Sequence, residues 1–587
     1  MRTGLKKAFS IMIGFIVAVV CVCCGPSTVK PGGEDEIRVD PTKTQLYVSN
    51  FNGAYGQEWL LAAAKRFEEK WKDKSFEDGK QGVQVVPDNN KTTGADIINR
   101  LASTSNDVFF TERVYYNDLV ASGNALDITE IVTEKLTEYG ETRSILDKLT
   151  QQQQEYYNAG NRYYAVPHYQ GFRGITYDVD MFTEEGFYFE ANPDLDAAAN
   201  KINTYYENDN DGFVTSEDAV KSNGPDGKPN TYDDGLPATY DEFFMLCAKI
   251  ADAGYTPCIY TGSNQVYFTE FLSALAADYE GLDDMMLNFT YNGTAHHLVE
   301  TDGNGRVKFG SDGEPILRAD TTIKPSNGYE LSAQAGKYYA LKFAERLIRG
   351  NYLDSRSFGT LSHTDAQKAY AYSRFNSSTD IAMLIESNYW ENEASDMNVF
   401  STMEKQWPGK AGRMDRKFAM MPFPKATEAQ VGEDVTIIEY QDAAGFIRKN
   451  IPDYKKELAL DFLQFVCTDE SLVEFTKITG CTRAFKYGVP SEVELSNFSK
   501  SVLDMMERGS IVNTFSTTEL FRNNAAALDF THYWNTRINY GQGDMQFNTP
   551  GKDIHDDPKI TAVNYFEGTM KVKSKDFWNS FSAYFEK

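Results

Sequence analysis

Histidine is scarce in this chain, with six residues among 587. It is the side chain best suited to acid–base catalysis near neutral pH, so its scarcity disfavours an enzyme that relies on it. The sequence also lacks the GxSxG, HExxH and GxxxxGK[ST] motifs of common hydrolases and nucleotide-binding proteins. The segment His296-His297-Leu-Val-Glu300 has zinc-protease residue types in the wrong order.

Basic residues are also in short supply. Lys and Arg number 58 against 85 Asp and Glu, which gives a net charge of −27. Nucleic-acid binding and electrostatic docking on anionic lipid both need basic surfaces, so we expect no nucleic-acid partner. No internal repeat is evident in the sequence, which disfavours a repetitive surface adhesin.

Cysteine is rare, and three of the seven cysteines lie together near the N-terminus. A basic segment and the apolar stretch 8–22, which is short for a spanning helix, precede Cys21-Val22-Cys23-Cys24-Gly25. This arrangement resembles a bacterial lipoprotein signal, although Cys21 and Cys23 replace the usual Leu and small residue. We expect a signal peptide over 1–23, lipidation of Cys24 and a flexible tether over 24–44. Lipidation of Cys23, or an ordinary secretory peptide, is the alternative.

Four cysteines remain in the body of the chain, namely Cys247, Cys258, Cys467 and Cys481. Their spacing allows two local disulfides, Cys247–Cys258 and Cys467–Cys481, and four buried free thiols are an equal alternative. No CxxC or Cys/His metal spacing is present.

The length predicts more than one hydrophobic core. Apolar strands at 45–53, 82–86 and 107–112 alternate with amphipathic helices at 57–71 and 94–102. Strand–helix alternation predicts a parallel sheet, whose ligands bind at the carboxyl ends of the strands. A second strand–helix pattern begins near residue 236, so the sequence predicts an α/β protein of two lobes.

The stretch from Tyr163 to Asp178 reads as strand, bend and strand. Pro167 ends the first strand, and Gly171 and Gly174 free the backbone at the bend. It is either a crossing between two lobes or a hairpin inside one of them.

Five segments, taken in order, resemble one protein family. They are Tyr164–Pro167 with Gly174–Asp178, Leu236–Phe243, Ala382–Trp390, Met420–Pro424 and Lys456–Phe465. In the same order, they resemble five features of that family: the first interlobe crossing, a P-x-T-x-x-E-F helix start, a segment presenting a stacking tryptophan, the second interlobe crossing, and the helix before the third interlobe crossing. The family is that of the extracellular solute-binding proteins of carbohydrate ABC importers, the maltose-binding-protein-like family 1.

The resemblance implies a two-lobed, periplasmic-binding-protein-like fold with hinge crossings between helix-flanked sheets. Lobe 1 is expected over 45–168 and 421–482, and lobe 2 over 173–420 and 483–587. It also implies capture of an oligosaccharide between the lobes, without catalysis, and delivery to the permease subunits of an ABC importer. The location would be extracytoplasmic, on the outer face of the cell membrane through the lipid anchor. The alternative is a secreted glycoside hydrolase or another carbohydrate-active lipoprotein, since two facing carboxylates are enough for that chemistry.

Aromatic rings match the apolar faces of sugars, and carboxylates and amides match their hydroxyl groups. Such residues occur at the strand ends, at the bend and after the apolar strand near 380–387. Trp390 is the leading candidate for stacking on the sugar. For both Trp390 and Trp534, the alternative is packing in the core. His168 is expected to be structural. The candidate ligand-binding residues are Asn52, Tyr55, Glu112, Tyr115, Tyr169, Gln170, Tyr267, Asn388, Trp390, Glu391 and Trp534.

An acidic insertion at about 200–235 contains a loop with EF-hand spacing. Gly212 takes the sixth position, and a second acidic turn follows at 224–235. Two departures weaken the match, Glu in place of Asp at position 1 and Asp in place of Glu at position 12. We expect one or two structural Ca²⁺ ions, against a plain Asx-rich loop. The expected ligands are Glu207, Asp209, Asp211, the Phe213 carbonyl and Asp218.

Overall fold

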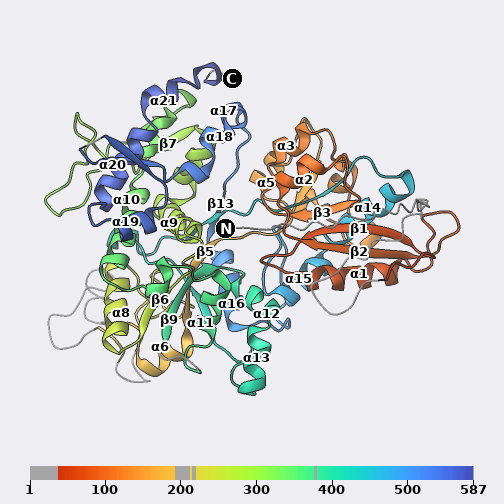
Figure 1. The fold of residues 1–587 in the computed structure, drawn as a ribbon, viewed down its shortest axis with the longest axis horizontal. Helices are drawn as coiled ribbons and strands as arrows, with labels where there is room; N and C mark the ends of the chain where they lie inside the picture. The colour runs from red at the N-terminus through yellow and green to blue at the C-terminus, as the bar shows by residue number, and fades with distance from the viewer. Residues whose placement is uncertain (1–37, 192–211, 215–219, 376–379, 542, 586–587) are drawn as a thin grey trace, which may run out of the picture.

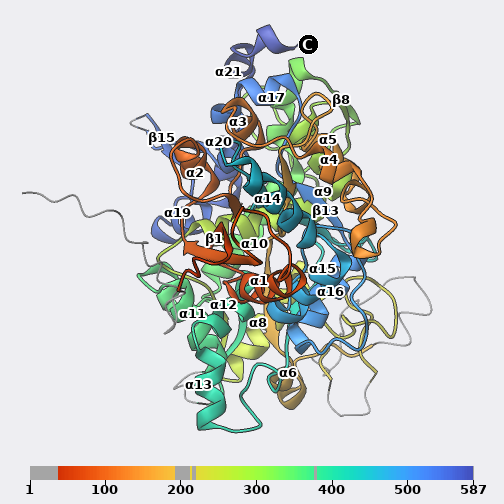
Figure 2. The same cartoon turned by 90° about the vertical axis from the view of Figure 1, so that its right-hand side faces the viewer.

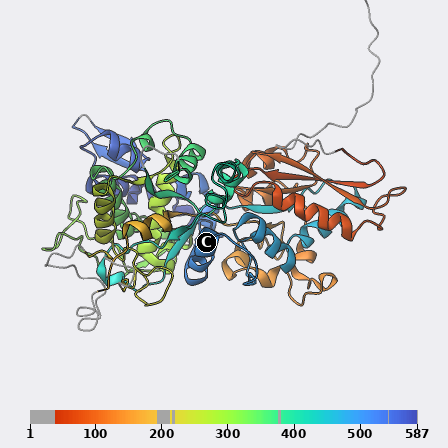
Figure 3. The same ribbon diagram turned by 90° about the horizontal axis from the view of Figure 1, so that it is seen from below.

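The computed structural model describes residues 38–191, 212–214, 220–375, 380–541 and 543–585. The chain forms a smaller and a larger lobe, each with its own sheet and buried core (Figure 1). The predicted α/β two-lobed fold is confirmed. The lobes lie side by side in Figure 3, and Figure 2 looks onto the small lobe. No helix in the described ranges has the length and apolarity needed to cross a membrane.

The small lobe begins with the predicted alternation of strands and helices. Strand β1 pairs in parallel with both β2 and β3, and helix α1 buries its apolar face beneath them. These elements are β1 (Thr44–Phe51), α1 (Glu58–Lys70), β2 (Val83–Asn90), α2 (Gly94–Arg100) and β3 (Val108–Thr111).

Strand β2 continues beyond Pro87, where the sequence predicts its end. Pro87 lies opposite Val48 of β1, and β2 is the edge strand of the sheet. An edge strand tolerates proline because half of its N–H groups face away from the sheet. The strand therefore extends to Asn90.

The remainder of the small lobe consists of helices and two further strands of its sheet, β4 and β12. The sheet order β2-β1-β3-β12-β4 places β4 at the other edge, which accommodates Pro167. These elements are α3 (Tyr116–Ala121), α4 (Thr129–Thr133), η1 (Thr137–Tyr139), η2 (Leu146–Lys148), α5 (Gln151–Tyr156), β4 (Ala165–Pro167), β12 (Ala444–Ile447), α14 (Asp453–Phe465) and α15 (Asp469–Thr479).

The large lobe is built on a four-stranded sheet of order β10-β5-β9-β6. Strand β5 is antiparallel to β10 and β9, and β6 is parallel to β9. Every residue of β9 is buried, as its apolar sequence predicts. The strands are β5 (Arg173–Asp178), β6 (Thr256–Ile259), β9 (Ile381–Ser387) and β10 (Phe418–Met421).

Helices cover this sheet. Helix α8 starts where the sequence predicts, because the Thr239 hydroxyl accepts a hydrogen bond from the Glu242 backbone N–H at 3.3 Å. The helices are α6 (Val179–Glu185), α8 (Tyr240–Asp252), α9 (Val266–Thr290), η3 (Pro325–Ala333), α10 (Ala335–Arg349), η4 (Ser355–Phe358), α11 (His363–Ala371), α12 (Trp390–Asp396), α13 (Val399–Gln406), η5 (Glu428–Gln430) and α16 (Asn497–Arg508).

The last hundred residues contain strands as well as the expected helices. Strand β13 pairs in parallel with β11, and two small hairpin sheets lie in the outer part of the large lobe (Figure 1). Three of these strands come earlier in the chain, namely β7 (Gly293–Ala295), β8 (Thr321–Ile323) and β11 (Thr436–Glu439). The elements that follow α16 are β13 (Ser510–Asn513), α17 (Glu519–Asn523), α18 (Ala525–Leu528), η6 (Phe530–His532), β14 (Thr536–Asn539), β15 (Asp544–Phe547), α19 (Pro550–Asp556), α20 (Ala562–Val572), α21 (Lys575–Asn579) and η7 (Ser582–Tyr584).

Within the residues that the structure describes, the chain crosses between the lobes three times, and the crossings lie beside one another. The first joins β4 of one sheet to β5 of the other, so the stretch is a crossing and not a hairpin. Its His168 N–H donates to the Ala443 carbonyl at 2.8 Å, and its Gly171 carbonyl accepts from the Tyr440 N–H at 3.1 Å. On the third crossing, Arg483 forms a β-bridge with Tyr169.

The second crossing lies later in the chain than the sequence suggests. The segment Met420–Pro424 does not leave the large lobe, because β10 pairs with β5 there. The chain then forms β11, whose Ile437 and Ile438 are buried in the core of the large lobe. Residues 421–440 therefore lie with the larger lobe, and the chain crosses between β11 and β12.

Candidate functional site

Residues from both lobes meet around the crossings, at a junction that we call the interlobe seam. The Tyr55 hydroxyl of the small lobe donates to the Gln170 carbonyl at 2.7 Å. From the large lobe, the Asn388 amide donates to the Tyr55 hydroxyl at 3.4 Å, and the Asn392 amide donates to the Ala54 carbonyl at 3.1 Å. The structure thus brings the candidates Tyr55, Gln170 and Asn388 together.

A buried acid from the end of β3 also reaches the seam. The Tyr169 hydroxyl donates to Glu112 Oε1 at 2.5 Å, and the rings of Tyr169 and Tyr55 lie 4.0 Å apart. Burial raises the pKa of Glu112 to about 7, although the hydrogen bond from Tyr169 opposes this shift. Glu112 therefore changes its charge near neutral pH.

Arg173, the first residue of β5, has several charged and aromatic partners at the seam. Its Nε donates to Glu270 Oε2 at 2.9 Å and its Nη1 to Glu386 Oε1 at 2.5 Å. The guanidinium lies 3.4 Å from the centre of the Tyr267 ring and 4.9 Å from that of Tyr440. Two carboxylates accept hydrogen bonds from the N–H groups of the guanidinium, and aromatic rings lie against its faces.

Further polar side chains extend this group toward solvent. His363 Nε2 lies 3.4 Å from Glu393 Oε1, and the Gln367 amide donates to Glu393 Oε2 at 2.7 Å. Burial acts to raise the pKa of Glu393, but the contacts with His363 and Gln367 outweigh it and lower that pKa. The partly exposed members are Tyr267, Glu270, His363, Glu393 and Tyr440. With Arg173 and Glu386, they form what we call the Arg173 cluster.

The composition of the Arg173 cluster indicates what it can bind. Flat aromatic rings complement the C–H faces of a sugar, and carboxylates accept hydrogen bonds from its hydroxyl groups. Its three glutamates outnumber the single arginine, so the cluster suits a neutral ligand better than an anionic one.

Sequence reasoning missed Arg173, Glu270, His363, Glu386, Glu393 and Tyr440. Two of them carried a usable signal. Arg173 and Glu386 are charged residues in segments that read as strands, and such residues are buried only when they are paired. The other four lie on helices and loops among many similar residues.

Glu439, at the end of β11, is buried beside the second crossing but is already fully engaged. Its carboxylate accepts from the backbone N–H groups of Gln441 at 2.6 Å, Asp442 at 3.2 Å and Gly171 at 3.4 Å. Burial raises the pKa of Glu439 to about 7, against these hydrogen bonds. It joins the first and second crossings and serves as a structural carboxylate.

Trp390 does not line the seam. Its side chain is 0% exposed, and it packs edge-to-face on Tyr370, Phe418 and Phe498. Helix α12 begins at this residue and turns the indole into the core of the large lobe. The stacking role expected for Trp390 gives way to its alternative, core packing.

Two other candidates are also directed away from the seam. The Trp534 indole is buried and donates to the Ser273 hydroxyl at 2.8 Å. Glu391 is buried, lies 2.9 Å from Arg413 Nε and accepts from the Ser496 hydroxyl at 2.6 Å. Both side chains are already engaged within the large lobe, so we withdraw them as ligand-binding candidates.

Tyr115 and Asn52 lie at the margin of the small lobe. Tyr115 is 43% exposed, and its hydroxyl lies 3.4 Å from Asp529 Oδ2 of the large lobe. Asn52 follows β1, is partly exposed and donates its backbone N–H to the Asn90 carbonyl at 2.6 Å. Both stay predictions, as do Tyr55, Glu112, Tyr169, Gln170, Tyr267 and Asn388.

The structure bears only partly on the Ca²⁺ and signal predictions. Glu207, Asp209, Asp211 and Asp218 lie outside the described residues, as do residues 1–37 with Cys23 and Cys24. The Phe213 ring is buried against Phe189, with ring centres 4.5 Å apart. The four cysteines in the described ranges, Cys247, Cys258, Cys467 and Cys481, are buried free thiols.

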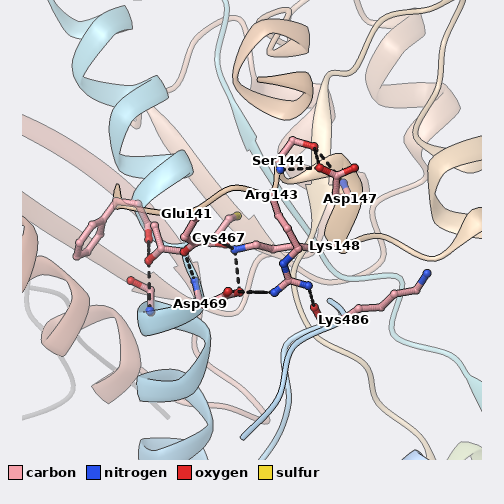
Figure 4. A network of polar contacts seen from close by, with 11 residues as sticks. Glu141, Arg143, Ser144, Asp147, Lys148, Cys467, Asp469 and Lys486 are labelled. Atoms are coloured by element: carbon pink, nitrogen blue, oxygen red, sulfur yellow. Dashed lines mark hydrogen bonds and ion pairs between the residues drawn. The ribbon is translucent and has the colours of Figure 1, made fainter. Parts of the chain in front are cut away.

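A second buried network, in the small lobe, offers a contrast (Figure 4). Lys148 Nζ lies 2.5 Å from Glu141 Oε2 and 3.0 Å from Asp469 Oδ1, and it donates to the Cys467 carbonyl at 2.9 Å. Arg143 Nη2 bonds both oxygens of Asp469 at 2.9 and 3.0 Å. A surface hollow of about 540 Å³ lies next to this network, and its lining comes entirely from the small lobe.

Comparison with known proteins supports the fold. No protein-family model and no curated protein matches the sequence. Among solved structures, the solute-binding protein RafE in complex with raffinose is 14% identical, with a TM-score of 0.50 over 92% of this chain and 100% of that one. The fold is that of a solute-binding protein. The predicted resemblance is thus confirmed at the level of fold.

Other solved structures show the same likeness. A chitin oligosaccharide binding protein is 13% identical, with a TM-score of 0.51 over 92% of this chain and 99% of that one. The GacH receptor of Streptomyces glaucescens, also studied in complex with acarbose, is 11% identical, with a TM-score of 0.50 over 92% and 98%. Apo RafE from Streptococcus pneumoniae is 14% identical, with a TM-score of 0.50 over 93% and 100%.

Proposed function

We propose that this protein captures an oligosaccharide between its two lobes and delivers it to the permease of an ABC importer. The observation that carries the proposal is the Arg173 cluster beside the first and second crossings. It combines partly exposed aromatic rings with hydrogen-bonding carboxylates where the two lobes meet. A ligand that is held there and also reaches the small lobe would favour closure of the two lobes by hinge motion.

The structural neighbours support a carbohydrate as the ligand. RafE is in complex with raffinose, another neighbour binds chitin oligosaccharides, and GacH is in complex with acarbose. The excess of carboxylates over cations at the cluster favours neutral or amino sugars over uronic acids and sugar phosphates.

A panel of neutral, amino and acidic oligosaccharides tests the proposal. Each is screened for a rise in melting temperature, and the positive ones are titrated by calorimetry. We expect binding of a neutral or amino oligosaccharide and recovery of the sugar unchanged by mass spectrometry. Shortened sugar would favour the hydrolase alternative, and failure of every sugar to bind would contradict the proposal.

The geometry favours binding without turnover. A glycosidase needs a carboxylic acid and a carboxylate free to act on the same bond. Glu439, whose pKa is raised to about 7, accepts hydrogen bonds from several backbone N–H groups, and Glu112, whose pKa is also raised to about 7, is bound to Tyr169.

Attachment to the membrane is proposed from the sequence. Residues 1–23 would be removed as a signal peptide and Cys24 lipidated, which would hold the protein on the outer face of the membrane near its permease. Mass spectrometry of the membrane-extracted protein should find the acyl chains on Cys24. Acylation of Cys23 would move the site by one residue, and release of unacylated protein into the medium would contradict the anchor.

Structural Ca²⁺ is likewise proposed for the acidic insertion. We expect the melting temperature to be higher in Ca²⁺ than in EGTA, because ligand that binds only the folded state stabilises it. Asp209→Asn should remove this difference. Equal melting temperatures of the unmodified protein in the two buffers would contradict the site.

A further inference from the structure

Three metal-ligating side chains converge in the outer part of the large lobe, on α9 and just after β7. One ligand atom from each of Glu280, Asp284 and His297 lies within 4.8 Å of the other two. His297 Nδ1 is 3.6 Å from Glu280 Oε2 and 3.7 Å from Asp284 Oδ2. These separations exceed a hydrogen bond but are close to the spacing of about 3.3 Å between donors around tetrahedral Zn²⁺.

The backbone explains why these residues meet. Glu280 and Asp284 are four positions apart on α9, and Gly281 between them breaks the helix with φ 72° and ψ 174°. Strand β7 then returns the chain beside α9 and places His297 opposite the two carboxylates. Glycine adopts this positive φ without strain, so the break is encoded at that position.

Glu280 provides a separate indication of a binding site. Its side chain is 0% exposed, and its Oε1 accepts the Gly336 N–H at 2.7 Å. Its Oε2, which faces His297, receives no hydrogen bond from any described residue, and neither does His297 Nδ1. Leaving a buried charged oxygen without a hydrogen bond destabilises the fold, so such atoms normally have a partner.

A neighbouring histidine orients one of the two carboxylates. Asp284 Oδ2 accepts the His296 N–H at 2.7 Å, and its Oδ1 lies 2.7 Å from His296 Nδ1. Such second-shell pairing is common at metal sites.

We propose that Glu280, Asp284 and His297 bind a divalent transition-metal ion, with Zn²⁺ as the ion to test. Water completes the tetrahedron from the side of His297, which is 35% exposed. The imidazole ligand and the small number of oxygen donors disfavour Ca²⁺ and Mg²⁺, which prefer six or more oxygens.

The bound ion would have a structural role. It would tie the break in α9 to the segment after β7, close to the start of α10 at Gly336. Two residues of the Arg173 cluster, Tyr267 and Glu270, lie at the other end of α9. Metal binding should therefore raise the melting temperature and leave sugar affinity nearly unchanged.

Equilibrium dialysis of the EDTA-treated, purified protein against micromolar Zn²⁺ tests the site. Millimolar Ca²⁺ in the buffer keeps the acidic insertion from taking up Zn²⁺. We expect about one equivalent of Zn²⁺ per chain, and visible absorption of the Co²⁺-loaded protein typical of tetrahedral coordination.

Two site variants and one control decide where the ion binds. His297→Asn changes a partly exposed residue, and Glu280→Gln retains the shape and the Oε1 acceptor. Each should weaken Zn²⁺ binding about 10- to 100-fold. The control, His555→Asn, alters an exposed histidine 2.9 Å from Asp556 and should bind like the unmodified protein. Absence of Zn²⁺ binding, or equal binding by all four proteins, would overturn the proposal.

Discussion

Lys148 and Arg173 are both fully buried cations, each paired with two carboxylates. The partners of Lys148 all belong to the small lobe and fasten the start of α15 to the segment around Glu141 (Figure 4). Arg173 is the first residue of β5, directly after the first crossing, and its partners include partly exposed aromatic rings and acids. Burial of an ion pair alone therefore does not identify a binding site.

The difference lies in what remains for a ligand to use. Lys148 directs its bonds to two carboxylates and a carbonyl, so its network is complete. In the Arg173 cluster, Tyr267, Glu270 and Glu393 keep exposed surface beside a fixed cation. Rigid support behind accessible hydrogen-bonding groups is what a preorganised site requires.

Arg173→Met should have the largest effect. It leaves Glu386 buried without its cation, which costs about 3–5 kcal/mol of stability, and it removes the support of the Tyr267 ring. We expect a lower urea midpoint and a loss of affinity of at least about 100-fold for the best sugar of the panel. Arg173→Lys, which retains the charge, should recover stability more than affinity. Calorimetry showing normal affinity would remove Arg173 from the site.

Lys148→Met sharpens the contrast. It should lower stability by about 3 kcal/mol, because Glu141 and Asp469 lose their shared cation. Sugar affinity should stay within about twofold, since both partners lie away from the seam. Urea denaturation and calorimetry measure the two quantities. A large loss of affinity at unchanged stability would reverse the roles that we assign to the two networks.

The pH dependence of stability should reveal Glu112. Its pKa is about 7 in the folded protein and near 4.5 when unfolded, so the folded state holds the proton more tightly between these values. The contribution is fully present below about pH 4.5 and is lost as pH rises through 7. From pH 5 to pH 8 it should fall by roughly 2–3 kcal/mol.

Glu112→Gln provides the matched comparison, because an amide still accepts the Tyr169 hydrogen bond and does not titrate. The variant should gain stability relative to the unmodified protein as pH rises. Parallel stability curves for the two proteins between pH 5 and pH 8 would show that Glu112 has an ordinary pKa.

Gly171→Ala tests how closely the crossings pack. A Cβ atom at this position would overlap Cγ of Gln441 and lie 3.2 Å from Cε1 of Tyr389. We expect about 1–3 kcal/mol of destabilisation and weaker sugar binding, because the overlap separates the first and second crossings. Gly488→Ala, where nothing lies within 4 Å, is the control. Equal effects of the two substitutions would argue against tight packing at Gly171.

Tyr267→Ala should have the smallest effect. Loss of one stacking face should weaken sugar binding about tenfold with little change in melting temperature. Tyr454→Ala, which alters an exposed tyrosine on α14 of the small lobe, should leave affinity unchanged. If calorimetry finds the same affinity for both variants, the ring of Tyr267 does not contact the sugar.

The sequence predicted those features that depend on local pattern. Alternating strands and helices indicated the small-lobe sheet, and the spacing from Thr239 to Glu242 indicated the start of α8. Pro167 and Gly171 indicated a bend between two strands, and only the family resemblance identified that bend as the first crossing. The second crossing was misplaced because β10 and β11 are both short and apolar. Hydrophobicity shows that a strand is buried but does not show in which sheet.

The direction of side chains was the second feature that the sequence did not predict. Trp390 follows directly from β9, but the chain turns into α12 there, and one helical step rotates a side chain by about 100°. The Glu280, Asp284 and His297 cluster depends on a helix break and a returning strand, which place donors from different elements together. Neither event leaves a periodic signal in the sequence.

Hydrogen exchange, measured by mass spectrometry with and without the best sugar of the panel, tests the central claim most directly. Ligand that bridges the lobes should slow exchange in the crossing segment 167–173, in 386–393 and in 436–443. The Lys148 network, at 141–148 and 467–469, should exchange equally in both samples. Protection confined to one lobe, or found at the Lys148 network and not at the crossings, would contradict capture between the lobes.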